Sequence, residues 1–187
     1  MVKSGITSRR QVTAMATLAV CLLLGGAAGS ASPRPRTSVA TANLCRAAEE
    51  VIFTCTVGAK IVSLCGGAEQ NASYRFGTAA APEIALSSGS AGSAARFGVA
   101  QTGYSGGGEA QVQVTNGRTQ YIVYSRIVRT GFGPGGNDPQ AEAGVSVRQD
   151  DHTIATRRCT GASASADLDV AAAQRHMPQA SFVDDDE

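Results

Sequence analysis

The sequence predicts an all-β protein, an antiparallel sandwich or barrel of about eight strands stapled by two disulfides. Short β-rich runs alternate with Gly, Ser, Pro and Asn turn signals throughout residues 44–159. The pattern lacks the alternation of strands with long helices that a Rossmann-type fold requires. An even number of cysteines remains once a predicted leader is set aside. These observations favour a single exported β domain.

Residues 1–31 have the features of a secretory signal peptide. Three basic residues, with no acid among them, precede an apolar run at residues 12–24, and small residues follow up to Ala31. The run is short for a bilayer span, which disfavours the alternative of an uncleaved N-terminal anchor. We therefore expect a secreted or periplasmic protein with no membrane span after cleavage of the signal.

Composition divides the remainder of the chain into three parts. Residues 32–43 contain two prolines and small polar residues, and predict a flexible lead-in. Residues 44–159 form the β domain. Residues 160–187 are rich in Ala, Ser and acid, so we expect a mostly disordered tail with at most a short helix at residues 167–176.

The cysteines indicate disulfides rather than a metal site. Loss of the signal removes Cys21 and leaves Cys45, Cys55, Cys65 and Cys159, an even set in an exported chain. Zinc sites usually contain a C-x-x-C pair, which this spacing lacks. The residues at 135–142 include oxygen ligands but not the spacing of an EF-hand loop. We expect no metal and no other cofactor.

The first predicted hairpin suggests which cysteines bond. Residues 51–57 and 60–65 are β-rich and flank Gly58-Ala59. If those two residues form the turn, Cys55 faces Val62, and Cys65 lies on the opposite face of the hairpin. Cys55 and Cys65 then point apart and should not bond to each other. We predict the pairs Cys45–Cys55 and Cys65–Cys159.

Later segments predict further hairpins joined by glycine loops. The clearest hairpin joins residues 110–115 to residues 118–130 through an Asn116-Gly117 turn, with Val112 facing Tyr121. A last hairpin turns at Asp150-Asp151. Residues 104–109 and 131–143 are predicted to be loops because of their glycine content.

One motif resembles a hydrolase active site. Ser105 lies in a G-x-S-x-G sequence, and Asp138 and His152 follow in the chain order of the α/β hydrolases. That motif needs a strand before the serine and a helix after it, whereas here it runs into the alternating strand at residues 110–115. We therefore expect no catalytic residue. A small secreted hydrolase using Ser105, or the loop acids Glu109 and Asp138, is the alternative.

The predicted ligand-binding residues lie in the two glycine loops and on the strand between them. Loops held by a rigid sheet commonly carry binding groups. Three arginines near tyrosines on residues 118–130, Arg118, Arg126 and Arg129, form either a patch for an anionic ligand or outward positions that favour solubility. The candidate residues are Tyr104, Ser105, Glu109, Arg126, Arg129, Asn137 and Asp138.

The balance of charged residues constrains the kind of partner. The chain has 16 basic and 15 acidic residues, and loss of the three basic residues of the signal leaves 13 against 15. This balance gives no electrostatic case for binding nucleic acid. We expect a monomer whose partner is another protein or an envelope component.

Several motifs occur in order between Leu44 and Cys159: EEVIFTC, KIVSLC, YRFG, YSGGGE, YIVYSR and RRC. In this respect the chain resembles a family of small exported bacterial proteins with cysteine-containing opening strands and a closing cysteine. The resemblance implies export, disulfides and a single β domain. That family has no established activity, so the resemblance assigns no catalytic residue.

These observations predict an exported, non-catalytic binding or inhibitor-like module of unknown ligand. Its size is similar to that of the small β-rich periplasmic inhibitors of lysozyme, which insert a loop into the cleft of the enzyme. The alternatives are the small secreted hydrolase described above and a structural envelope protein.

Overall fold

The computed structural model describes residues 42–89, 95–133 and 136–184. The predicted signal peptide and almost all of the predicted lead-in lie outside these residues. The described part of the chain contains nine strands, one short 3₁₀ helix and one α-helix. None of its helices is long and apolar enough to cross a bilayer.

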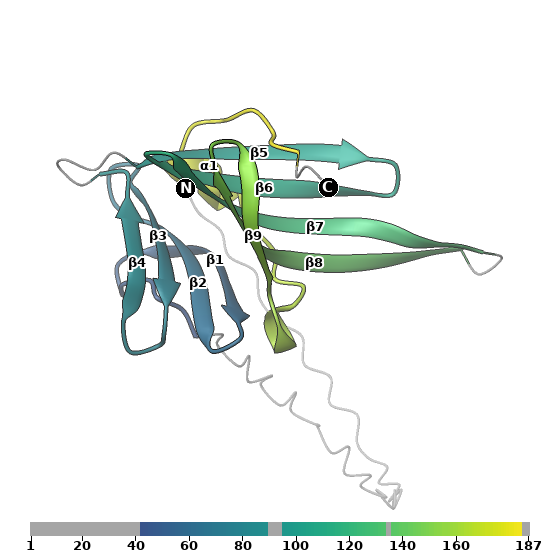
Figure 1. The fold of residues 1–187 in the computed structure, drawn as a ribbon, viewed down its shortest axis with the longest axis horizontal. Helices are drawn as coiled ribbons and strands as arrows, with labels where there is room; N and C mark the ends of the chain where they lie inside the picture. The colour runs from purple at the N-terminus through teal and green to yellow at the C-terminus, as the bar shows by residue number, and fades with distance from the viewer. Residues whose placement is uncertain (1–41, 90–94, 134–135, 185–187) are drawn as a thin grey trace, which may run out of the picture. The chain divides into compact units, whose positions relative to one another are not determined.

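The strands form two antiparallel sheets, in each of which the neighbours follow chain order (Figure 1). The four-stranded sheet contains β1 (Glu50–Val57), β2 (Lys60–Gly66), β3 (Ala72–Gly77) and β4 (Pro82–Ser87). The five-stranded sheet contains β5 (Arg96–Tyr104), β6 (Gly107–Asn116), β7 (Thr119–Gly133), β8 (Gly136–Gln149) and β9 (His152–Arg158). The predicted all-β, antiparallel fold is confirmed.

The inner faces of the two sheets share one hydrophobic core. Tyr74 of β3 stacks on Tyr121 of β7, with 5.0 Å between the ring centroids. Alternate residues of each strand point into this core, as the period of two requires. The buried cluster includes Phe53, Cys55, Val62 and Leu64 from the smaller sheet, and Phe97, Val99, Val112, Val114, Val123 and Val145 from the larger one.

The first hairpin has the predicted register. Val57 pairs with Lys60 across Gly58-Ala59, and Cys55 pairs with Val62. Cys65 lies on the outer face of the sheet, so the prediction that Cys55 and Cys65 do not bond to each other is confirmed.

The predicted disulfide pairs, however, are wrong. The structure has Cys45–Cys65 and Cys55–Cys159. Residues 42–49 run over the outer face of the smaller sheet, where the Leu44 amide donates to Ser63 Oγ at 3.0 Å. This path brings Cys45 to the outward-facing Cys65. Cys55 points into the core, where it meets Cys159 at the end of β9.

The turn of the β6–β7 hairpin lies one residue later than predicted. Gly117 and Arg118 form the turn, Gly117 has a φ of +60°, and Asn116 pairs with Thr119. Val114 rather than Val112 is therefore opposite Tyr121. The predicted and observed registers differ from each other by two residues. Both keep the valines on the inner face, so the hydrophobic pattern does not discriminate between them.

Both predicted glycine loops are hairpins instead. Residues 104–109 contain only a tight turn at Ser105 and Gly106, because β5 continues to Tyr104 and β6 begins at Gly107. Residues 131–143 belong mostly to β7 and β8, which pair with each other out to Gly133 and Gly136. Glycine content predicted irregular structure here, but the cross-strand hydrogen bonds are still formed.

The short helix expected within residues 167–176 is present, but the prediction that residues 160–184 are mostly disordered is wrong. These residues include a 3₁₀ turn, η1 (Gly161–Ser163), and a helix, α1 (Val170–His176), which begins where the Asp169 carboxylate accepts from the Ala172 amide at 2.8 Å. Their few apolar side chains recur at helical spacing and pack into the core. The buried ones are Leu168, Ala172, Ala173 and Met177.

We predict that the two disulfides differ in their contribution to stability. Cys55–Cys159 spans 104 residues and Cys45–Cys65 spans 20. In the chain-entropy model, the longer loop stabilises the fold by about 1.5 kcal/mol more than the shorter one. The paired variant Cys55→Ala/Cys159→Ala should therefore lose more free energy of unfolding in urea than Cys45→Ala/Cys65→Ala. Mass mapping of non-reduced peptides that joined Cys65 to Cys159 would contradict the observed pairing.

Candidate functional site

The predicted binding residues gather at one end of the five-stranded sheet, which we call the free end because β5 to β8 extend there past the smaller sheet (Figure 1). The β5–β6 turn and the tip of the β7–β8 hairpin both lie at this end. Tyr104 ends β5, Ser105 lies in the turn, and Glu109 lies on β6. The remaining candidates are Arg126 and Arg129 on β7 and Asn137 and Asp138 on β8, of which the Asn137 side chain lies outside the described residues.

A row of alternating charges crosses the outer face of the free end. Glu109, Arg126 and Glu142 are directly opposite one another on β6, β7 and β8. Arg126 forms ion pairs with Glu142 and, at 3.8 Å, with Glu109. Arg158 of β9 extends the row by lying 3.7 Å from Glu142. Opposite charges facing each other across strands stabilise a sheet and hold its side chains in place.

Two tyrosines border this charged row. The guanidinium carbon of Arg126 lies 5.2 Å from the centre of the Tyr124 ring, within the range of a cation–π contact. The Tyr104 hydroxyl donates to the Gly108 carbonyl at 3.3 Å.

The electrostatics of the row raise the pKa values of Arg126 and of the neighbouring Tyr104. Burial acts to lower the pKa of Arg126, but the hydrogen bond to Glu142 and the charges of Glu142 and Glu109 outweigh burial and raise the pKa. Partial burial, followed by the charge of Glu109, raises the pKa of Tyr104. Arg126 is therefore a permanent cation, and Tyr104 is a neutral phenol at physiological pH. This arrangement favours binding of charged or polar groups over proton transfer.

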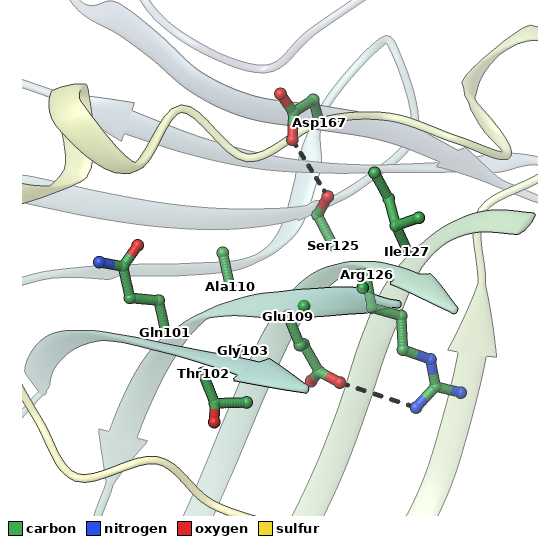
Figure 2. Close-up of a pocket in the computed structure, with 11 residues that line it drawn as sticks. Gln101, Thr102, Gly103, Glu109, Ala110, Ser125, Arg126, Ile127 and Asp167 are labelled. Carbon is green, nitrogen blue, oxygen red and sulfur yellow. Dashed lines mark hydrogen bonds and ion pairs between the residues drawn. The ribbon is translucent and has the colours of Figure 1, made fainter. Parts of the chain in front are cut away.

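The inner face of the free end contains an open hollow of about 660 Å³ (Figure 2). Gly103 and Gly108, which are opposite each other on β5 and β6, lie along it and contribute no side chains to fill it. Ile127, 49% exposed, supplies an apolar wall. Ser125 Oγ donates to the Asp167 carboxylate at 3.3 Å on the far side. The hollow therefore offers both apolar and polar contacts to a ligand.

Gly106 and Gly107 of the G-x-S-x-G segment have structural explanations. Gly106 has a φ of +92°, a conformation that side chains strongly disfavour. A side chain at Gly107 would collide with the Ile127 carbonyl oxygen. The side chain of Arg129 packs against the same turn, where it would meet any Cβ at Gly106. The motif thus forms a tight hairpin turn and not a nucleophile elbow.

The strand register separates the residues of the proposed triad. Ser105 lies between β5 and β6, so a strand and not a helix follows it directly. His152 pairs with Gln149 at one end of β8, while Asp138 lies near the other end. Eleven residues separate Asp138 from Gln149, about 35 Å at the usual rise of a strand. Ser105, Asp138 and His152 therefore cannot act together.

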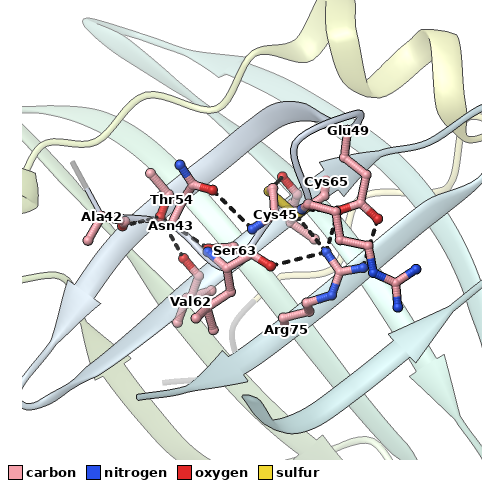
Figure 3. Close-up of a disulfide and its surroundings, with 12 residues drawn as sticks. Ala42, Asn43, Cys45, Glu49, Thr54, Val62, Ser63, Cys65 and Arg75 are labelled. Carbon is pink, nitrogen blue, oxygen red and sulfur yellow. Dashed lines mark hydrogen bonds and ion pairs between the residues drawn. A yellow bond between two sulfur atoms is a disulfide. The ribbon is translucent and has the colours of Figure 1, made fainter. Parts of the chain in front are cut away.

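The residues around Cys45–Cys65 superficially resemble a metal site (Figure 3). One ligand atom each from Cys45, Glu49 and Cys65 lies within 4.8 Å of the others. The two sulfurs, however, are bonded to each other. Arg75 occupies the remaining space, donating to Glu49 at 2.5 and 2.8 Å and to Cys65 Sγ at 3.2 Å. A buried cation bonded to the carboxylate makes this a structural corner of the fold.

Sequence reasoning missed several residues of the free end. Glu142 was expected in a loop, but the register places it in the charged row. Asp167 was expected in a disordered tail. Ile127 and Ser125 alternate with Arg126 along β7, so the period of two contained a signal that they share the opposite face.

No protein-family model, curated protein or solved structure matches this chain. The family resemblance drawn from the motifs therefore stays an expectation, and the function has to be argued from the site. The two disulfides indicate an oxidising, extracytoplasmic environment.

We predict that Arg75→Met lowers the free energy of unfolding at neutral pH by about 2 kcal/mol, because it removes the charged hydrogen bonds to the half-buried Glu49 carboxylate. The hydrogen bond from Arg75 lowers the pKa of Glu49 below its ordinary value of 4.5. The stability from this pair is therefore fully present above pH 4.5, and it is lost as the pH falls and Glu49 is protonated. Urea unfolding between pH 7 and pH 3 measures both effects.

The matched control for that experiment is Glu49→Gln, which keeps hydrogen-bonding groups without the charge. Both variants should show a smaller loss of stability than the wild type between pH 5 and pH 3. An unchanged acid dependence in both variants would show that the ion pair does not contribute.

Proposed function

We propose that this protein is an exported, non-catalytic binding module, secreted or periplasmic, that contacts a partner protein or envelope component through its free end. The observation that carries the proposal is the hollow beside Ile127, which lies on the opposite face of the sheet from the charged row of Glu109, Arg126 and Glu142. A concave site with apolar walls and a few fixed polar groups is the usual form of a binding site.

The ion pairs formed by the acidic residues of the charged row support binding over catalysis. A glycosidase would need one carboxyl group that holds a proton and a second that is free to act as base or nucleophile. Glu109 and Glu142 instead share the cation of Arg126. The hydrolase alternative also loses its triad, since His152 and Asp138 lie at opposite ends of β8.

The shape of the β7–β8 hairpin supports an inhibitor-like mode of binding. Pairing between β6 and β7 reaches Ile127 and Gly108, whereas β7 continues to Gly133. The last residues of β7 therefore pair with β8 alone, and this part of the hairpin extends past its neighbours (Figure 1). A narrow, two-stranded hairpin of this kind is suited to entering a cleft of a partner protein.

We expect the partner to contact Ile127 but not Ile154. Both side chains are exposed, at 49% and 60%, and they lie on β7 at the free end and on β9 respectively. A photo-crosslinking amino acid at position 127 should give a discrete adduct in extract from the exporting compartment. Excess unlabelled protein should compete for that adduct, and Ile127→Glu should compete at least about tenfold less well, since it places a charge in the apolar wall.

The same crosslinker at position 154 serves as the matched control. Equal labelling from the two positions, or no adduct that saturates, would contradict the proposed surface. Loss of a hydrolytic activity in Ser105→Ala would restore the hydrolase alternative instead.

A further inference from the structure

Residues 178–184, which we call the strap, leave the core after α1 and cross the edge of the five-stranded sheet at β5. The Val99 amide donates to the Pro178 carbonyl at 2.9 Å, and the Ala180 amide donates to the Val99 carbonyl at 2.9 Å. These bonds form a parallel bridge between Val99 and Gln179. The strap thus adds a short strand to the free edge of the sheet, a common mode of peptide recognition.

Beyond this edge the strap lies on the outer face, where two glutamines of β6 bind its backbone. Gln111 Nε2 donates to the Val183 carbonyl at 2.8 Å, and the Val183 amide donates to Gln111 Oε1 at 3.2 Å. Gln113 Nε2 donates to the Ser181 carbonyl at 2.6 Å. The two glutamines are two residues apart, as are Ser181 and Val183, so an extended peptide matches their spacing.

With the strap in place, both glutamines are buried and need hydrogen-bond partners. Gln111 is only 1% exposed, and its cross-strand neighbour Tyr124 is also buried. Gln113 lies opposite the buried Ile122. An amide that lost its partner in such a place would cost about 1–3 kcal/mol. Two buried side-chain amides, spaced to bond its carbonyls and amide, are therefore suited to a peptide backbone.

The end of this groove carries a positive charge. The buried Arg148 donates to the Asp184 carbonyl at 3.4 Å and to the Asp151 carbonyl at 2.5 Å. In the sequence Asp184 begins the acidic run DDDE. An extended segment whose acidic residues begin beside Arg148 therefore suits this end of the groove.

We infer that this groove, formed by the β5 edge at Val99 together with Gln111, Gln113 and Arg148, is a binding site for an extended peptide segment of a partner protein that ends in acidic residues. The strap occupies it as a displaceable internal ligand. The groove forms hydrogen bonds with the backbone of the strap, so another extended segment can make the same bonds. Because the strap is attached, its effective concentration is high, and it restrains binding of a weak competitor.

The test uses the full oxidised chain and a fluorescein-labelled synthetic peptide with the sequence of residues 178–187, PQASFVDDDE. Val183→Pro weakens the strap by removing the amide that donates to Gln111, and it leaves the groove unchanged. By fluorescence anisotropy, Val183→Pro should bind the peptide at least about tenfold more tightly than the wild-type chain, since its site is more often open. Equal affinity would overturn the inference.

Groove variants in the Val183→Pro background identify the site. Gln111→Leu should weaken peptide binding at least about tenfold. Gln140→Leu is the matched control, because Gln140 is exposed on β8, away from the strap, and should leave the affinity unchanged. The same weakening in both variants would show that the peptide does not occupy the groove.

Two further measurements complete the test. A peptide with its four acids replaced by amides should bind more weakly, and equal binding would remove the acidic preference from the inference.

If Val183→Pro does not fold, hydrogen exchange of the wild-type chain decides whether the strap is displaceable. The Ala180 and Val183 amides should exchange faster than those of β6 and β7, and equal protection would contradict displacement.

Discussion

The Cys55–Cys159 disulfide is the constraint on which the rest of the structure depends. It joins the inner face of β1 to the end of β9, and so links the two sheets inside their shared core. The chain that follows runs along β1, where the Thr160 amide donates to the Thr56 carbonyl at 2.8 Å and the Asp169 amide donates to the Ile52 carbonyl at 3.1 Å. This path covers part of the edge of β1. It also places Asp167 beside Ser125 at the rim of the hollow.

Segments from both ends of the described chain cover the outer faces of the sheets. Residues 42–49 lie over the smaller sheet, where Arg75 and Ser63 need polar partners. Residues 178–184 lie over the larger sheet, where Gln111 and Gln113 need them. In both cases a covering segment supplies backbone partners to polar side chains on the outer face, and over the smaller sheet it also supplies the Glu49 carboxylate to Arg75. The free end is the part of the larger sheet that extends past the smaller one, and this explains why the hollow lies there.

The two proposed binding surfaces use the same strands for different chemistry. At the free end, Arg126 neutralises Glu109 and Glu142, and the glycines of the β5–β6 turn leave room for a ligand. Nearer the middle of the sheet, the side chains of β6 recognise a peptide backbone instead. The five-stranded sheet supplies the rigidity for both, since cross-strand bonds fix the side chains that project from it.

Local chemistry in the sequence determined the strands, the register of the first hairpin and the orientation of its cysteines. Alternation has a period of two and Gly58 provides the turn, so neighbouring residues suffice to place Cys55 and Cys65 on opposite faces. The same reasoning brought Tyr104, Glu109 and Arg126 into the candidate site. Only the tertiary structure decided the disulfide partners, the order of residues 160–184 and the place of Glu142 in the charged row. Each of these depends on contacts between residues distant in the sequence: the path of residues 42–49 over a sheet, the core available to a few small apolar side chains, and the pairing of two glycine-rich strands.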